Sequence, residues 1–299
     1  MPIQDFRVDF STKNPDKEIV GRRELLSQDL EGNWTTTFKG KGMEFTGYRR
    51  YTYTDDASFI DWRASLRSRD LLVREFEEYR NFNILFLFDV SDTMLFSSHE
   101  KLKAEFAAEF IHALTGSAGK AGEAVGLYMF SDKLVSHIQP NFGVAIRKRL
   151  EINLANGELY GGKKDFKRSL LQTNALISPR CIVVVVSDFL ALGNEWESYL
   201  VLLSKKHDII GVQIKDPRDR VLPSSSGQFV LQDPNSNEQL RVDNDLFRKK
   251  YAQHAKDHEE YISQVFKRLR GRVVSIDTSW PLKKAVDTFF TAARQGGAQ

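Results

Sequence analysis

The chain has 299 residues, and its 43 basic and 40 acidic residues nearly cancel to a formal net charge of +3. A balance this close to neutral gives no bulk-charge argument for a nucleic-acid or membrane-surface partner. No stretch approaches the roughly 20 apolar residues of a membrane span, and Cys181 is the single cysteine. We therefore expect no integral membrane segment, no internal disulfide and a cytoplasmic location.

Residues 1–80 are predicted to hold an N-terminal β-rich subdomain that follows a polar leader. Residues 46–53 alternate as a half-buried strand does, and residues 71–79 alternate in the same way. Between them, Asp61, Trp62 and Arg63 admit two interpretations. Either Trp62 is a packing anchor and Asp61 forms an ion pair with Arg63, or the three residues belong to a docking surface for a partner protein.

From residue 81 to residue 299 the sequence alternates apolar runs with amphipathic segments. The apolar runs that are typical of buried strands are residues 83–88, 124–130, 181–186, 209–214 and 273–276. Apolar residues recur at helical spacing between these runs, and the first such helix is predicted to open at a capping box formed by Ser97 and Glu100. This alternation predicts an α/β domain with a doubly wound, mostly parallel sheet.

Two segments are predicted to depart from the parallel order. Residues 135–138 follow a turn and are expected to return as an antiparallel edge strand. Turn-forming residues surround two short apolar runs near residues 223–243, and this pattern indicates an inserted β-hairpin.

Oxygen-bearing side chains follow two of the buried strands. Asp89, Ser91 and Thr93 end the run that begins at residue 83, and Asp188 ends the run that begins at residue 181. Ligands of open parallel sheets bind beyond the carboxyl ends of the strands, where strand order reverses, so we expect these side chains to share one crevice. Two carboxylates and two hydroxyls suit Mg²⁺ or Mn²⁺. The plainer alternative is that they are helix caps and turn residues.

The sequence Asp89-Val90-Ser91-Asp92-Thr93, with Asp188 at the end of a later strand, resembles the metal-ion-dependent adhesion site of von Willebrand factor A domains. Residues 53–65 and 72–78 are similar to the signature of the bacterial and archaeal "domain of unknown function 58" family. Members of that family join this signature to a von Willebrand A-like domain. The resemblance covers roughly residues 36–290.

The resemblance implies a von Willebrand A-like fold for residues 81–299 and a non-enzymatic adaptor. Its partner would be a MoxR-type AAA+ ATPase or that ATPase's client, in complex assembly or chaperone-like activity. The resemblance also implies that Ser91 and Thr93 bind the metal directly and that Asp89 and Asp188 bind it mainly through water. An acidic residue of the partner would then occupy the open coordination position.

One loop departs from the family pattern. Where the second metal loop has Gly-Gly-Thr-Asp, this chain has Gly161-Gly162-Lys163-Lys164-Asp165. A lysine ammonium beside two carboxylates repels a divalent cation, or replaces it as the counter-charge that holds Asp89 and Asp188. An alternative is that the acidic residue of this loop supplies the missing oxygen. The predicted modifiers of the site are Lys163, Lys164 and Asp165.

The competing class of protein is a metal-dependent hydrolase that uses Asp89 and Asp188. No nucleophile–base pair is evident in these loops, and a phosphatase loop would need a second Asp where Ser91 stands. His254 and His258 lack the Glu that a zinc-protease helix places after its first His, so we expect them on a solvated helix face. These observations favour the adaptor.

Overall fold

A computed structural model describes residues 6–8, 10, 44–53, 55–68, 70–77, 83–177, 179–222, 229–232, 239–242 and 245–294. Contacts divide the chain into two compact units. One comprises Met1–Thr37 with Phe82–Gln299, and the other comprises Phe38–Asn81. Each unit is described separately below.

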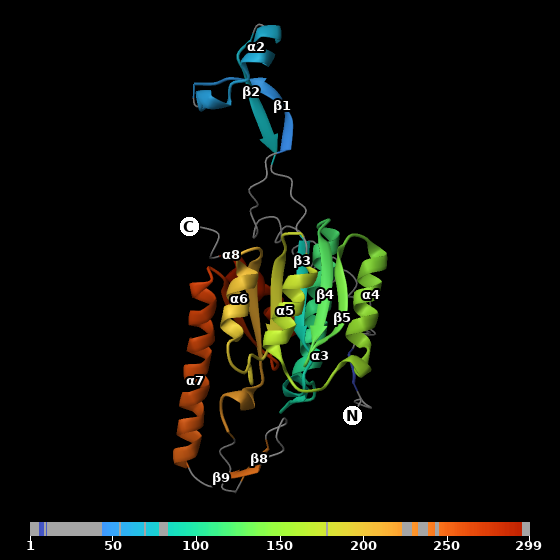
Figure 1. The fold of residues 1–299 in the computed structure, drawn as a ribbon, viewed down its shortest axis with the longest axis vertical. Coiled ribbons are helices and arrows are strands. Elements are labelled where there is room, and N and C mark those ends of the chain that lie inside the picture. Colours follow the sequence, from blue (N-terminus) through green and yellow to red (C-terminus); the bar gives the residue numbers. More distant parts are fainter. Residues whose placement is uncertain are drawn as a thin grey trace. The chain divides into compact units, whose positions relative to one another are not determined.

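In the larger unit, the described residues form a sheet in the strand order β10-β7-β6-β3-β4-β5 (Figure 1). The strands are β3 (Asn83–Asp89), β4 (Ala124–Phe130), β5 (Leu134–Asn141), β6 (Ile182–Ser187), β7 (Asp208–Lys215) and β10 (Arg272–Asp277). Every neighbouring pair is parallel except β4 and β5. The predicted doubly wound, mostly parallel sheet with an antiparallel edge strand is therefore confirmed.

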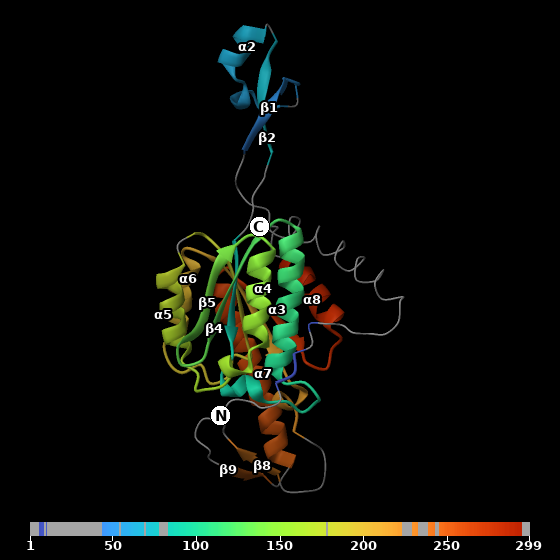
Figure 2. The same ribbon diagram turned by 90° about the vertical axis from the view of Figure 1, so that its right-hand side faces the viewer.

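Helices cover both faces of this sheet (Figure 2). Side chains of α5 (Phe166–Leu176), α6 (Trp196–Ser204) and α7 (Asp245–Arg268) share one apolar cluster with Leu85 and Leu87 of β3. The opposite face is covered by α3 (Lys103–Lys120), α4 (Val144–Ala155) and α8 (Leu282–Arg294). Ring contact between Phe110 of α3 and Phe289 of α8 joins two of these helices.

The central position of β3 explains why its sequence is apolar without alternation. Leu85 and Leu87 point to one layer of helices, and their neighbours Phe86 and Phe88 point to the other, so all four side chains are fully buried. From β3 the chain proceeds outward to β4 and β5, then returns to β6 on the other side of β3 and continues to β7. The strand order thus reverses between β3 and β6.

The predicted hairpin insertion is also present. Strand β8 (Phe229–Gln232) pairs with β9 (Gln239–Val242) in antiparallel fashion, in the interval between β7 and α7. It lies within the segment near residues 223–243 that the sequence indicated.

The start of α3 differs from the prediction. The capping box expected at Ser97 and Glu100 does not form, and the helix begins at Lys103. Ser98 instead donates its amide and its hydroxyl to Asp216, over 2.7 and 2.6 Å. The carboxylate that caps the helix is Glu105, which accepts from the Leu102 amide over 2.8 Å.

The smaller unit contains β1 (Glu44–Arg50), the 3₁₀ turn η1 (Ala57–Phe59), α2 (Trp62–Ser68) and β2 (Leu72–Glu77). Strands β1 and β2 form where the two alternating segments predicted strands, and they pair antiparallel. The predicted boundary grouped the leader with this unit, whereas the described leader residues lie against the larger one. The Arg7 amide donates to Glu105 over 2.7 Å, and the Phe6 ring lies 4.0 Å from that of Tyr160.

Replacing Leu87 by Ala should lower the free energy of unfolding by about 2–5 kcal/mol, because it leaves a cavity in the fully buried centre of the sheet. Ile152→Ala is the control, since this α4 side chain is 58% exposed, and it should change the free energy by no more than about 0.5 kcal/mol. Urea unfolding of the two variants measures the difference. Equal losses would contradict the central position of β3.

Candidate functional site

Asp89, Ser91 and Thr93 lie together at the carboxyl end of β3, as predicted. Asp89 Oδ1 accepts from the Ser91 amide over 3.0 Å and from the Ser91 hydroxyl over 2.7 Å. The hydroxyl oxygens of Ser91 and Thr93 lie 3.3 Å apart. All three residues are buried, so this turn presents its oxygen atoms inward.

Asp188 joins this group from the neighbouring strand. It follows β6 directly, and β6 pairs with β3. The preceding residue, Ser187, donates its hydroxyl to Asp89 Oδ2 over 2.6 Å. The two carboxylates therefore meet at the reversal of strand order, where the sequence placed them.

The ammonium group of Lys164 lies between these carboxylates. Its Nζ is 2.7 Å from Asp89 Oδ2, 2.7 Å from Asp188 Oδ1 and 2.9 Å from the carbonyl oxygen of Leu190. The Lys164 side chain is only 1% exposed. One ammonium thus satisfies both acids and the backbone of the β6–α6 loop.

A second buried lysine, which the sequence analysis missed, completes the network. Lys103 of α3 donates to Asp188 Oδ2 over 2.9 Å and to Asp219 over 3.2 Å, and its side chain is also 1% exposed. A signal was present in the sequence. Lys103 shares a helix face with Phe106 and Phe110, so its position in the apolar stripe required a buried partner.

Burial and these contacts shift the pKa values of Asp188, Lys164, Lys103 and Asp219. Burial alone would raise the pKa of Asp188, but the charges of Lys164 and Lys103 outweigh it and hold that pKa below its usual range. Burial lowers the pKa of Lys164, and Asp188 and Asp89 more than offset it, so the pKa lies above the usual value. The pKa of Lys103 is raised for the same reason, by Asp188 and Asp219. Burial raises the pKa of Asp219 in spite of Lys103.

Two glycines position Lys164. Gly161 and Gly162 have φ angles of +106° and +97°, a conformation that favours glycine. The Gly161 amide donates to the Val90 carbonyl over 2.7 Å, and the Gly162 amide donates to Asp92 Oδ1 over 2.7 Å. The glycine loop is thereby fastened to the turn that carries Ser91.

The other two predicted modifiers do not enter the crevice. Lys163 is exposed. Asp165 is exposed as well, and its carboxylate accepts from the Arg168 amide over 2.9 Å, which caps α5. Asp165 therefore does not supply the missing oxygen ligand.

The expected Mg²⁺ or Mn²⁺ ion does not fit this arrangement. A divalent cation held by Asp89 and Asp188 would need the space where the Lys164 ammonium lies within 2.7 Å of both, and it would be repelled by that charge. Among the residues described, no group of three or more His, Cys, Asp or Glu side chains is placed to hold a metal. Lys164 fills the position between the two carboxylates.

The loop after β6 contains a residue with a positive φ angle, and this turn orients the backbone groups that contact Lys164 and Asp188. Phe189 has a φ of +55°, which costs a non-glycine residue about 1 kcal/mol or more. Its ring is fully buried, and its carbonyl oxygen lies 2.9 Å from His258 Nε2. His258, predicted on a solvated face, is therefore partly buried against this loop. The turn directs the Leu190 carbonyl toward Lys164 and the Leu190 amide toward Asp188, over 3.0 Å.

In the smaller unit, Asp61, Trp62 and Arg63 do not form the predicted framework. The Asp61 carboxylate accepts from the backbone amides of Arg63 and Ala64, over 3.0 and 3.1 Å, and so caps α2. Trp62 is 63% exposed, so it does not anchor packing within the smaller unit. The alternative, a docking surface, agrees with this exposure.

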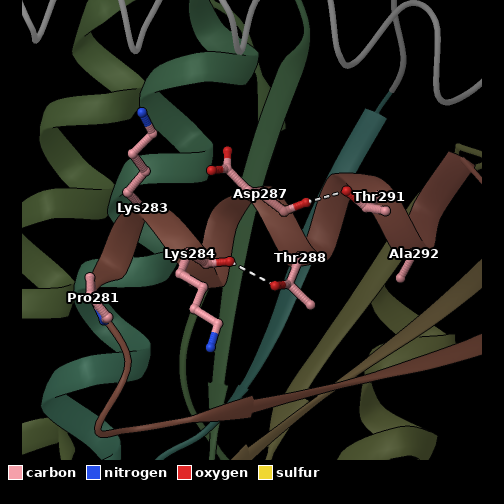
Figure 3. Close-up of a pocket in the computed structure, with 7 residues that line it drawn as sticks. All are labelled: Pro281, Lys283, Lys284, Asp287, Thr288, Thr291 and Ala292. Carbon is pink, nitrogen blue, oxygen red and sulfur yellow. Dashed lines mark hydrogen bonds between the residues drawn. The ribbon is translucent and has the colours of Figure 1, made fainter.

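A hollow of about 630 Å³ lies over α8 and contains none of the predicted site residues (Figure 3). Its walls carry Lys283, Lys284 and Asp287, with two threonines. Thr288 and Thr291 donate their hydroxyls to carbonyl oxygens one turn earlier in the same helix. Its polar groups show no convergence on a common ligand, and the cluster of Asp89, Asp188 and Lys164 remains the candidate site.

A family model described as "Protein of unknown function DUF58" matches residues 47–261. Over 281 residues the chain is 23% identical to an uncharacterized protein of Mycobacterium tuberculosis (Rv1480) and to one of Mycobacterium bovis (Mb1516). These alignments cover 92% of this chain and 87% of each relative.

Two solved structures are similar in fold. One is BatB from Bacteroides thetaiotaomicron, with a TM-score of 0.46 and 13% identity over 73% of this chain and 100% of that chain. The other is a von Willebrand factor type A protein from Catenulispora acidiphila, with a TM-score of 0.38 and 11% identity over 75% of this chain and 44% of that chain. The likeness goes no further than the fold. None of the helices in the described ranges has the length and apolar character that crossing a bilayer requires.

Replacing Lys164 by Met should lower the free energy of unfolding by about 3–5 kcal/mol, because two buried carboxylates lose their shared counter-charge. The adjacent Lys163→Met is the matched control, since Lys163 is exposed, and it should change stability by about 0.5 kcal/mol or less. Urea unfolding compares the two variants. A Lys164→Met protein as stable as the control would show that Lys164 does not neutralise the acids.

Proposed function

Because the chain belongs to the DUF58 family, whose model matches residues 47–261, we propose that it is a non-enzymatic interaction module. In this proposal it serves as an adaptor for a MoxR-type AAA+ ATPase, or for that ATPase's client, in complex assembly or chaperone-like activity. The resemblance of the N-terminal signature and of the turn at Asp89 to that family supports the partnership.

One observation carries the non-enzymatic part of the proposal. The Lys164 ammonium lies 2.7 Å from Asp89 and 2.7 Å from Asp188, and each of the three side chains is at most 1% exposed. Carboxylates that are neutralised and shielded in this way are poorly suited to act as a general base or to hold a catalytic metal against a substrate. This favours an adaptor over the metal-dependent hydrolase.

The same observation bears on how the adaptor binds its partner. In an adhesion site, a bound cation lies between the protein's oxygen atoms and the carboxylate of the partner. Here Asp89 and Asp188 are neutralised by Lys164 and at most 1% exposed, so they offer no coordination position to a partner's carboxylate. In this proposal the partner therefore binds without a divalent cation, and outside the crevice.

Binding of the ATPase should be independent of divalent metal. The measurement is biolayer interferometry of the chain, first freed of metal by a chelator, against nucleotide-free MoxR-type ATPase of the same organism, with and without Mn²⁺. Nucleotide-free ATPase is used so that chelation does not act through its own Mg²⁺–ATP. We expect equal Kd values in the two buffers. Binding only in the presence of Mn²⁺ would contradict the proposal.

A further inference from the structure

The smaller unit leaves most of its described apolar side chains exposed. Along η1 and α2, Phe59 is 44% exposed, Trp62 63% and Leu66 83%. In the described part of this unit, Val73 is the one hydrophobic residue that is buried. Trp62 and Leu66 are four residues apart on α2, so they form one apolar ridge on the helix. A contiguous exposed patch of this kind marks an interaction surface.

Basic side chains run beside this ridge. Arg63 and Arg67 are also four residues apart on α2, and both are exposed. No ion pair involves either of them within the described residues, whereas nearby carboxylates have partners. Asp55 is paired with Arg49 over 2.6 Å, and Asp70 with Arg50 over 3.1 Å. Asp56 and Asp61 accept from backbone amides at the starts of η1 and α2.

We propose that the α2 face, formed by Phe59, Trp62, Arg63, Leu66 and Arg67, is a docking surface for an acidic amphipathic helix of the ATPase. This inference rests on the adaptor role proposed for the chain. The matching helix would place apolar side chains at i and i+4 against the ridge, with carboxylates alongside for the two guanidinium groups. Trp and Arg are the residue types that most often dominate binding energy at protein interfaces.

Charge and helix length disfavour the other occupants of this face. A second copy of the chain would meet it through a two-fold axis, which brings Arg63 and Arg67 of both copies together. To an anionic bilayer, a helix of seven residues offers only a short apolar stripe. An acidic protein segment satisfies both the apolar and the basic groups.

The experiment measures the Kd between the full chain and the nucleotide-free ATPase for two double variants. Trp62→Ser with Leu66→Ser removes the ridge, and Arg63→Glu with Arg67→Glu reverses the charge. Each should weaken binding by at least about 10-fold. The control is Ile152→Ser on α4, an apolar residue that is 58% exposed, and it should bind like the wild type. Far-UV circular dichroism verifies that the variants are folded.

The outcomes distinguish a failure of the proposed docking surface from a failure of the proposed adaptor role. Wild-type affinity in both double variants overturns the α2 face but leaves the adaptor role. No binding of the ATPase by the wild-type chain contradicts the adaptor role, and with it the surface. Three further results would assign the face to another occupant and so overturn the inference. They are a wild-type dimer that the variants dissociate, sedimentation with phosphatidylglycerol vesicles that the variants abolish, and protection of α2 amides from hydrogen exchange in the free chain that the variants remove.

Discussion

The ammonium of Lys164 between Asp89 and Asp188 is the interaction on which the carboxyl edge of the sheet depends. Two carboxylates that end neighbouring strands repel each other in a buried setting unless a positive charge separates them. In the adhesion sites that this sequence resembles, a divalent cation supplies that charge. Here Lys164 lies 2.7 Å from both acids, and Lys103 adds a second ammonium 2.9 Å from Asp188. The positive charges that neutralise these acids therefore belong to lysine side chains of the protein itself.

The use of lysine side chains in place of a bound cation has structural consequences. A buried charge network of this kind contributes little net stability compared with apolar packing, but losing one member is costly because the others stay buried and unpaired. The members are Asp89 of β3, Asp188 directly after β6, Lys103 of α3, Lys164 before α5 and Asp219 after β7, so the network joins five segments of the chain. It also removes the open coordination position through which an adhesion site holds its partner. A docking surface elsewhere, such as the α2 face, is then required for an adaptor.

Much of this arrangement could be predicted from the sequence, for identifiable reasons. Asp89 and Asp188 each follow an apolar run. Strands that alternate with helices are parallel, so their carboxyl ends lie at the same edge of the sheet. Gly161 and Gly162 matched the metal loop, and the two lysines that follow them marked the departure from it. Predictions failed where a side chain had a choice of partners. Ser97 bonds to the backbone of His99 instead of capping α3, and Asp61 caps α2 instead of pairing with Arg63. In both cases the local sequence offers the side chain more than one partner and does not decide between them.

The most direct test of the central claim is calorimetric titration of Mn²⁺ into the wild-type chain and into Lys164→Thr, which restores the hydroxyl of a metal loop and removes the ammonium. Lys163→Thr, on the neighbouring exposed residue, is the matched control. If Lys164 takes the place of the cation, the wild type and the control bind no Mn²⁺ and Lys164→Thr binds one ion. Stoichiometric binding of Mn²⁺ by the wild-type chain, lost in Asp89→Asn, would contradict the account.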